Sequence, residues 1–130
     1  MAGASPTYRP GRNLALKVPA PEFEATVAFY RDVLKFREIP GPADSATPTA
    51  RFEFGDKVLW VDRMDGLSQS EIWLEIETDD PKAAATYLAE AGCIRRDEIE
   101  PLPEGSGAFW IASPSRTIHL VVGDPAQART

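Results

Sequence analysis

The side chains best suited to chemistry in this chain alternate along strand-like segments. Glu71 and Glu75 lie on either side of Trp73, and Trp60 lies in an earlier segment of the same kind. A carboxylate withdrawn from water can attract a cation or act as a base, and an indole ring stacks on flat or cationic ligands. His119, the single histidine, could serve as a base, a hydrogen-bond donor or a metal ligand. Together these residue types favour a ligand site that is both polar and aromatic.

Each of these residues also has a plainer structural interpretation. His119 stands between the apolar Ile118 and Leu120, so it could be a half-buried histidine hydrogen-bonded within its strand. The two glutamates could belong to a solvated sheet face. Trp60 and Trp73 are predicted to contact a ligand, whereas Trp110 is assigned to packing. Arg51 and Glu53 could line a cleft or decorate a sheet edge, and the sequence does not decide between these.

A weak internal repeat predicts the elements that position these residues. The strand-like segment 13–18 leads through a proline turn into a helix from Pro21 to about Lys35, and the segment 71–77 leads into a second helix. Asp79 or Asp80 caps the second helix, Pro81 occupies its first turn and Gly92 ends it. Two further strands follow each helix, at 51–54 and 57–62, and at 108–112 and 117–122. A cleft between two such units is a natural ligand site.

The strand alternation predicts two different faces. Aliphatic positions are expected to face the helices: Leu14, Leu16, Val18, Ile72, Leu74, Ile76, Ile118, Leu120 and Val122. The opposite positions mix charge with tryptophan: Asn13, Lys17, Trp60, Asp62, Glu71, Trp73, Glu75, Thr117 and His119. Antiparallel neighbours with helices on one side indicate an α+β fold.

Length and composition limit the possible classes of protein. The 130 residues form one domain by size, divided here into a flexible arm (1–12), two modules (13–63 and 70–123) and a polar tail (124–130). The net charge of −6 argues against nonspecific nucleic-acid binding. No apolar run is long enough for a membrane helix, and one cysteine allows no internal disulfide. We therefore expect a cytoplasmic protein with neither nucleic-acid nor membrane partners.

Three segments carry a resemblance to a known superfamily. They are residues 14–18 with the helix ending 29–36, residues 72–76 with the aspartate-capped helix, and residues 109–114 running into 118–120. This pattern resembles the vicinal oxygen chelate superfamily of glyoxalase I, bleomycin-resistance proteins and extradiol dioxygenases. Lys35 departs from it, because family members usually carry glycine there. The resemblance implies two βαβββ modules that form a half-barrel cleft, and a homodimer.

The resemblance also implies where a metal would bind. Metal-using members place ligands at four strand positions, which here hold Asn13, Trp60, Glu71 and His119. Tryptophan cannot coordinate a metal, so Glu71, His119 and Asn13 are weak candidates, whereas catalytic sites usually need about three good protein ligands. No cofactor is therefore favoured, although a divalent Ni, Zn, Mn or Fe ion remains the alternative.

These observations leave three hypotheses for function. The favoured one is a metal-independent small-molecule-binding protein that holds an aromatic or cationic ligand in a dimeric cleft. Its ligand-binding residues would be Trp60, Trp73, Glu71, Glu75, His119 and Asn13. The second is a metal-dependent lyase, isomerase or dioxygenase of the same superfamily, and the third is a structural or regulatory module that only dimerises. The sequence identifies neither the ligand nor whether loop 38–50 or the arm at 1–12 covers the cleft.

Overall fold

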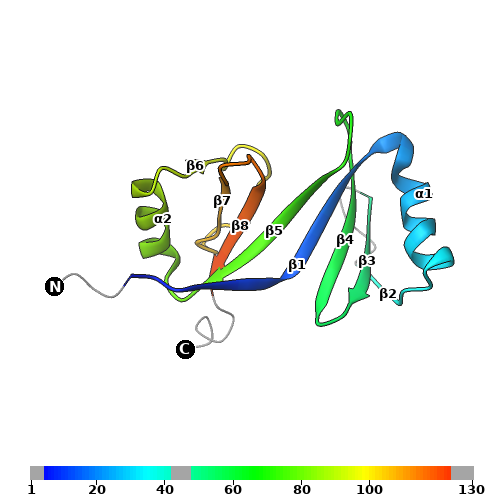
Figure 1. Cartoon of the computed structure of the whole chain (residues 1–130), viewed down its shortest axis with the longest axis horizontal. Helices are drawn as coiled ribbons and strands as arrows, with labels where there is room; N and C mark the ends of the chain where they lie inside the picture. The colour runs from blue at the N-terminus through cyan, green and yellow to red at the C-terminus, as the bar shows by residue number, and fades with distance from the viewer. Residues whose placement is uncertain (1–4, 42–47, 124–130) are drawn as a thin grey trace. The chain divides into compact units, whose positions relative to one another are not determined.

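The computed structural model describes residues 5–41 and 48–123. Its elements follow the order β1 (Tyr8–Pro19), a 3-10 turn (Ala20–Glu22), α1 (Phe23–Ala28), a π-helical turn (Phe29–Val33), β2 (Glu38–Ile39), β3 (Thr49–Phe54), β4 (Lys57–Met64), β5 (Glu71–Thr78), α2 (Pro81–Glu90), β6 (Ile94–Arg95), β7 (Phe109–Ala112) and β8 (Ile118–Gly123). Figure 1 traces this order along the chain. The architecture is α+β, with a mixed sheet and two helices.

The strands form one hydrogen-bonded order, β2-β3-β4-β1-β5-β8-β7-β6. Within it, β1 pairs parallel with β4 and β5 pairs parallel with β8. The pairs β2–β3, β3–β4, β6–β7 and β7–β8 are antiparallel. The chain divides into two compact units. The first module unit is Arg12–Trp73, and the second module unit runs from Leu74 onward and includes the N-terminal residues through Gly11.

The first module unit has its own apolar core between the sheet and α1. Its buried residues are Val18, Val27, Ala50, Phe52, Leu59 and Val61, with Leu14, Leu16, Phe23, Tyr30 and Phe36 packed against them. The predicted facing of strand 13–18 is thus confirmed, because Leu14, Leu16 and Val18 all contact this core. The Gly55-Asp56 turn between β3 and β4 is also confirmed, with Gly55 at a φ of 67°.

The helix of this unit ends in an irregular way. After α1 the chain makes a π-helical turn, and Lys35 follows at a φ of 58°. This left-handed conformation is the one that glycine adopts without cost, so a lysine stores strain there. Lys35 Nζ donates to the Asp32 carbonyl at 3.1 Å, which accounts for part of its placement.

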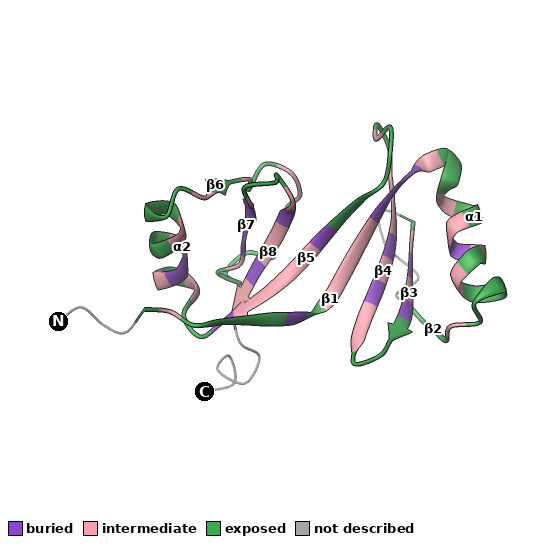
Figure 2. Ribbon diagram, in the orientation of Figure 1, coloured by how far each residue is buried: buried purple, intermediate pink, exposed green. Residues whose placement is uncertain are grey.

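The second module unit packs α2 against β7 and β8. Its core contains Ala84, Phe109, Ile111 and Val121, with Ala85 and Leu88 packed against it. All four residues of β7 are buried (Figure 2). The Asp80 carboxylate accepts a hydrogen bond from Ala83 N at 3.1 Å, which confirms the predicted helix cap. Of the predicted buried stripe, Tyr87 and Ala91 are exposed, so the stripe is narrower than predicted.

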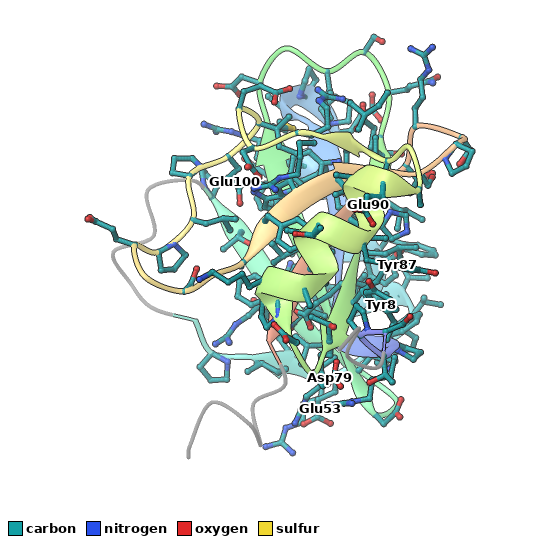
Figure 3. The ribbon with its side chains drawn as sticks, turned by 90° about the vertical axis from the view of Figure 1, so that its left-hand side faces the viewer. Tyr8, Glu53, Asp79, Tyr87, Glu90 and Glu100 are labelled. Carbon is teal, nitrogen blue, oxygen red and sulfur yellow. The ribbon has the colours of Figure 1, made fainter. Side chains whose placement is uncertain are left out.

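The N-terminal strand is longer than predicted. β1 begins at Tyr8, within the segment expected to be a loose arm, because long-range contacts hold it. Thr7 N donates to Asp79 Oδ1 at 2.9 Å, and Arg9 pairs with Glu77. The ring of Tyr8 lies 6.1 Å from that of Tyr87 (Figure 3). Burial, followed by the nearby Tyr87 and Asp79, raises the pKa of the Tyr8 phenol.

The predicted facing of the last strand is wrong by one residue. His119 pairs with Ile111 and with Leu74, and Val121 pairs with Phe109. Because paired residues share a sheet face, His119 and Val121 lie on the side of α2, whereas Ile118, Leu120 and Val122 lie on the other side. His119 therefore does not share a face with Glu75, whose partner in β8 is Leu120.

Two short edge strands, β2 and β6, bring each module to the three strands after the helix that the βαβββ resemblance implies, although their positions were not predicted. Residues 42–47 of the proposed lid segment 38–50 lie outside the described residues. Among residues 5–41 and 48–123, no helix is both long and apolar enough to cross a membrane.

Candidate ligand-binding face

The face of the first module unit that points away from its core carries the polar and aromatic side chains. Core residues alternate with them along each strand, so Lys17, Trp60 and Arg51 lie on this outer side. The strand register places Thr49, Asp62 and Lys17 in one row, and Arg51, Trp60 and Ala15 in the next. We call these six residues, together with Asn13, Glu71 and Trp73, the polar–aromatic face.

A buried ion pair is the central feature of the polar–aromatic face. Lys17 Nζ lies 2.9 Å from Asp62 Oδ2, and the two side chains are only 7% and 16% exposed. The Thr49 hydroxyl contacts the second oxygen of the same carboxylate. A buried charge pair of this kind is fixed in position, because either partner alone would be left uncompensated.

The same ammonium covers Trp73. Lys17 Nζ lies 4.2 Å from the centroid of the Trp73 ring, and Trp73 is 5% exposed. The Trp73 indole N–H donates to Glu71 Oε1 at 3.0 Å. Trp73 was predicted to stack on a ligand, but one face of its ring already meets the Lys17 cation. Its contact with a ligand stays a prediction.

Trp60 is placed differently. It is half-buried, and its indole N–H donates to Asn13 Oδ1 at 2.7 Å. This bond joins two of the predicted site residues and fixes the edge of the ring. Arg51, its direct partner on β3, places its guanidinium carbon 5.2 Å from the ring centroid. Arg51 therefore lies beside Trp60 on this face, and its role in lining a cleft stays a prediction.

Two predicted site residues belong to the second module unit. Glu75 is half-buried, and a Cβ added at Gly11 would lie 2.8 Å from Glu75 Cβ, so the backbone passes close to this side chain. His119 is also half-buried, and its Nδ1 lies 2.9 Å from the Thr117 carbonyl. A carbonyl only accepts, so the Nδ1 atom carries a proton. Whether either residue contacts a ligand stays a prediction.

The positions that the resemblance assigns to metal ligands offer few donors in the first module unit. Trp60 offers no lone pair, and the amide oxygen of Asn13 already accepts the indole N–H. Across the two described stretches, 5–41 and 48–123, no three His, Cys, Asp or Glu side chains come together as a metal-binding group. The donor set is thus poorer than the three protein ligands usual at catalytic zinc.

A separate hollow of about 700 Å³ opens at the far end of this unit. It is lined by Lys35, Phe36, Arg37, Glu53, Phe54 and Gly55. Glu53, which the sequence left open as a cleft residue, lies on its wall, but none of the predicted ligand-binding residues does. The hollow is wide open to solvent, unlike a typical ligand site.

Comparison with known proteins identifies the family. A model of the glyoxalase-like domain matches residues 14–128. The chain belongs to the glyoxalase-like domain family. Proteins of this superfamily bind small molecules. No curated protein sequence was found to match the chain.

Solved structures share the fold at low sequence identity. A Mn(II)-bound glyoxalase from Novosphingobium aromaticivorans superposes with a TM-score of 0.60 at 22% identity, over 87% of this chain and 38% of that one. A glyoxalase/bleomycin resistance protein/dioxygenase superfamily member from Vibrio splendidus matches with a TM-score of 0.57 at 12% identity, over 91% and 100%. A mutant of homoprotocatechuate 2,3-dioxygenase from Brevibacterium fuscum matches with a TM-score of 0.60 at 17% identity, over 95% and 34%. The chain thus spans little more than a third of the length of the two named enzymes.

Sequence reasoning missed the ion pair at the centre of the face. Lys17 and Asp62 were both placed on the outer side, but nothing in the sequence showed that they meet, because 45 residues separate them. The available signal was that Lys17 lies within a predicted strand and is assigned to the same sheet face as Asp62.

Proposed function

We propose that this protein binds a small aromatic molecule without a metal ion, and that the Trp60 ring is the surface on which the ligand stacks. The observation that carries the proposal is that the Trp60 ring is both partly accessible and fixed in position. It is half-buried on the outer sheet face and held by one edge through Asn13. A partly accessible, immobilised indole offers apolar contact area at a small entropic cost.

The remaining polar residues would orient the ligand. Glu71 accepts the Trp73 indole N–H, which directs its carboxylate along the same face. The Lys17–Asp62 pair holds Trp73 and the β4 backbone in place. We propose that a second copy of the chain completes the cleft. Sedimentation of the protein with and without ligand would test this dimer.

Intrinsic fluorescence provides the first test. The protein would be titrated with a panel of aromatic compounds while tryptophan emission is followed in the wild type, Trp60→Phe and Trp110→Phe. Trp110 is the control, because it is buried in the second module unit and bonded to the Glu100 carbonyl. Quenching that vanishes in Trp60→Phe and persists in Trp110→Phe supports the proposal, whereas equal quenching in all three proteins would contradict it.

The metal-dependent alternative is tested separately. Ni²⁺, Zn²⁺, Mn²⁺ and Fe²⁺ would be titrated into chelator-treated wild type, His119→Ala and Glu71→Gln. We expect no stoichiometric binding that either substitution removes, because no third donor of the described residues joins His119 or Glu71 in a cluster. Stoichiometric binding that depends on these residues would favour the metal-dependent enzyme.

A further inference from the structure

We infer that the ligand of the Trp60 site is an aromatic carboxylate, and that Arg51 recognises its anionic group. This inference rests on the proposed function and names its ligand class. The sequence alone allowed an aromatic or a cationic ligand. The charges on the polar–aromatic face distinguish these two possibilities.

Three carboxylates of the first module unit each have a partner within that unit. Asp62 pairs with Lys17, and Glu53 lies 3.4 Å from Arg37. Glu71 accepts the Trp73 indole N–H. The charges of Asp62 and Glu53 are thus balanced by protein cations, and one oxygen of Glu71 is bonded to the Trp73 indole.

Arg51 is in the opposite situation. No carboxylate of the described residues forms an ion pair with Arg51. One of its terminal nitrogens donates to the Pro40 carbonyl, and its guanidinium lies against the Trp60 ring. Its Nε is buried and has no hydrogen-bond partner among residues 5–41 and 48–123. A buried donor without an acceptor is costly, and an incoming carboxylate oxygen would satisfy it.

Arg63 provides an internal comparison. Its Nε is likewise buried without a hydrogen bond, but the Asp65 carboxylate lies 3.5 Å away and balances its charge. Within the part of the chain that the structure describes, Arg51 therefore combines an unsatisfied donor with a charge that no carboxylate balances, beside a half-buried indole. A planar guanidinium suits a carboxylate better than any neutral acceptor does, and the adjacent ring would take the aromatic part of the same ligand.

Both cations on this face also oppose a cationic ligand. Lys17 lies over the Trp73 ring and Arg51 lies over the Trp60 ring, so each ring that could attract a ligand cation is already in contact with a cation of the protein. Because Asp62 balances the Lys17 charge, repulsion of a ligand ammonium would come mainly from Arg51 beside the Trp60 ring.

The test uses three probes with one ring system: naphthoate, naphthylmethanol and naphthylmethylammonium. Calorimetric titration of the full chain at neutral pH should give the tightest binding for naphthoate, by about tenfold or more over the ammonium probe, as charged hydrogen bonds allow. Arg51→Gln should abolish this preference, whereas Arg51→Lys should retain part of it. Arg95→Gln is the matched control, because Arg95 covers the Phe109 ring at 4.6 Å in the second module unit.

Three results would overturn the inference. If the ammonium probe binds as tightly as naphthoate, or if Arg51→Gln leaves the preference intact, the inference fails while aromatic binding stands. If Arg51→Gln and Arg95→Gln weaken naphthoate binding equally, Arg51 is not the recognising group. Failure of all three probes to bind would overturn the proposed function itself. Thermal unfolding of each variant separates these results from misfolding.

Discussion

Removing the ammonium of the buried ion pair should strongly destabilise the first module unit. In Lys17→Met the side-chain volume is nearly conserved, but Asp62, 16% exposed, loses the cation 2.9 Å away. Breaking a buried pair by deleting one partner typically costs about 3–5 kcal/mol. Because Asp62 is slightly exposed and keeps its contact with Thr49, we expect the lower end of this range, about 3 kcal/mol.

Urea unfolding followed by tryptophan emission measures this cost. With a slope of about 1.5–2 kcal/mol/M for a domain of this size, the midpoint should fall by about 1.5–2 M. The exposed pair of Arg37 and Glu53, with side chains 80% and 51% exposed, provides the control, and Arg37→Met should change stability by less than about 1 kcal/mol.

Two comparisons would refute this reasoning. If Lys17→Met costs no more than Arg37→Met, the pair does not behave as a buried one. The double variant Lys17→Met/Asp62→Leu should recover much of the loss, since no uncompensated charge remains. A double variant as unstable as the single one would show that the loss reflects packing rather than charge.

Four further changes have definite expected outcomes. Lys35→Gly should raise the free energy of unfolding by about 0.5–1 kcal/mol, because it removes the strain of a lysine at a φ of 58°. A lower thermal stability would instead show that the contact of Lys35 with the Asp32 carbonyl outweighs that strain. Asp80→Ala should cost about 1 kcal/mol through loss of the α2 cap, and Asp80→Ser should restore most of it; equal losses would contradict the capping role. Gly11→Ala should destabilise by about 1–3 kcal/mol, because the new methyl group meets the Glu75 side chain, and a neutral result would show that Glu75 can move aside. Burial raises the pKa of the Asp97 carboxyl, but hydrogen bonds from Arg95 and from Trp110 N hold that pKa below its usual value of 3.8. The ionised carboxylate therefore stabilises the fold above pH 3.8, and this stabilisation is lost as the pH falls below that value. The stability difference between the wild type and Asp97→Asn should shrink on acidification, and a constant difference would contradict this.

Much of the fold could be predicted because local signals agreed with one another. Alternation placed Leu14, Leu16 and Val18 toward the core, and Asp80 with Pro81 marked the start of a helix. The glycine at position 55 marked a tight turn. In each case the residue types determine the local structure with little help from distant residues.

The last strand shows where this reasoning fails. The run Ile118-His119-Leu120-Val121-Val122 contains no strict alternation, so period-two patterning does not determine which side faces α2. The pairing of His119 with Ile111 decides that the His119 side chain lies on the α2 side of the sheet. This register between β7 and β8 is set by the turn that joins the two strands. Likewise, the start of β1 at Tyr8 depends on contacts of the N-terminal segment with Glu77 and Asp79, about 70 residues away.

The sequence predicted which residues belong to the candidate site, but it did not predict which of them contact one another. The sequence placed Trp60, Asn13 and Arg51 on strands, yet the bond between Trp60 and Asn13 joins residues 47 positions apart. The burial of Trp73 under Lys17 could not be foreseen, because a tryptophan on an outer sheet face is predicted to be accessible. Such long-range pairs follow from the sheet register, which the sequence specifies only through the whole fold.

The most direct test of metal-free aromatic binding is calorimetric titration of naphthoate into wild-type protein and Trp60→Leu, each with and without excess EDTA. Binding to the wild type should be unaffected by EDTA and should be lost in Trp60→Leu, because the ring is the proposed stacking surface. Binding that disappears with EDTA, or that persists unchanged in Trp60→Leu, would contradict the account.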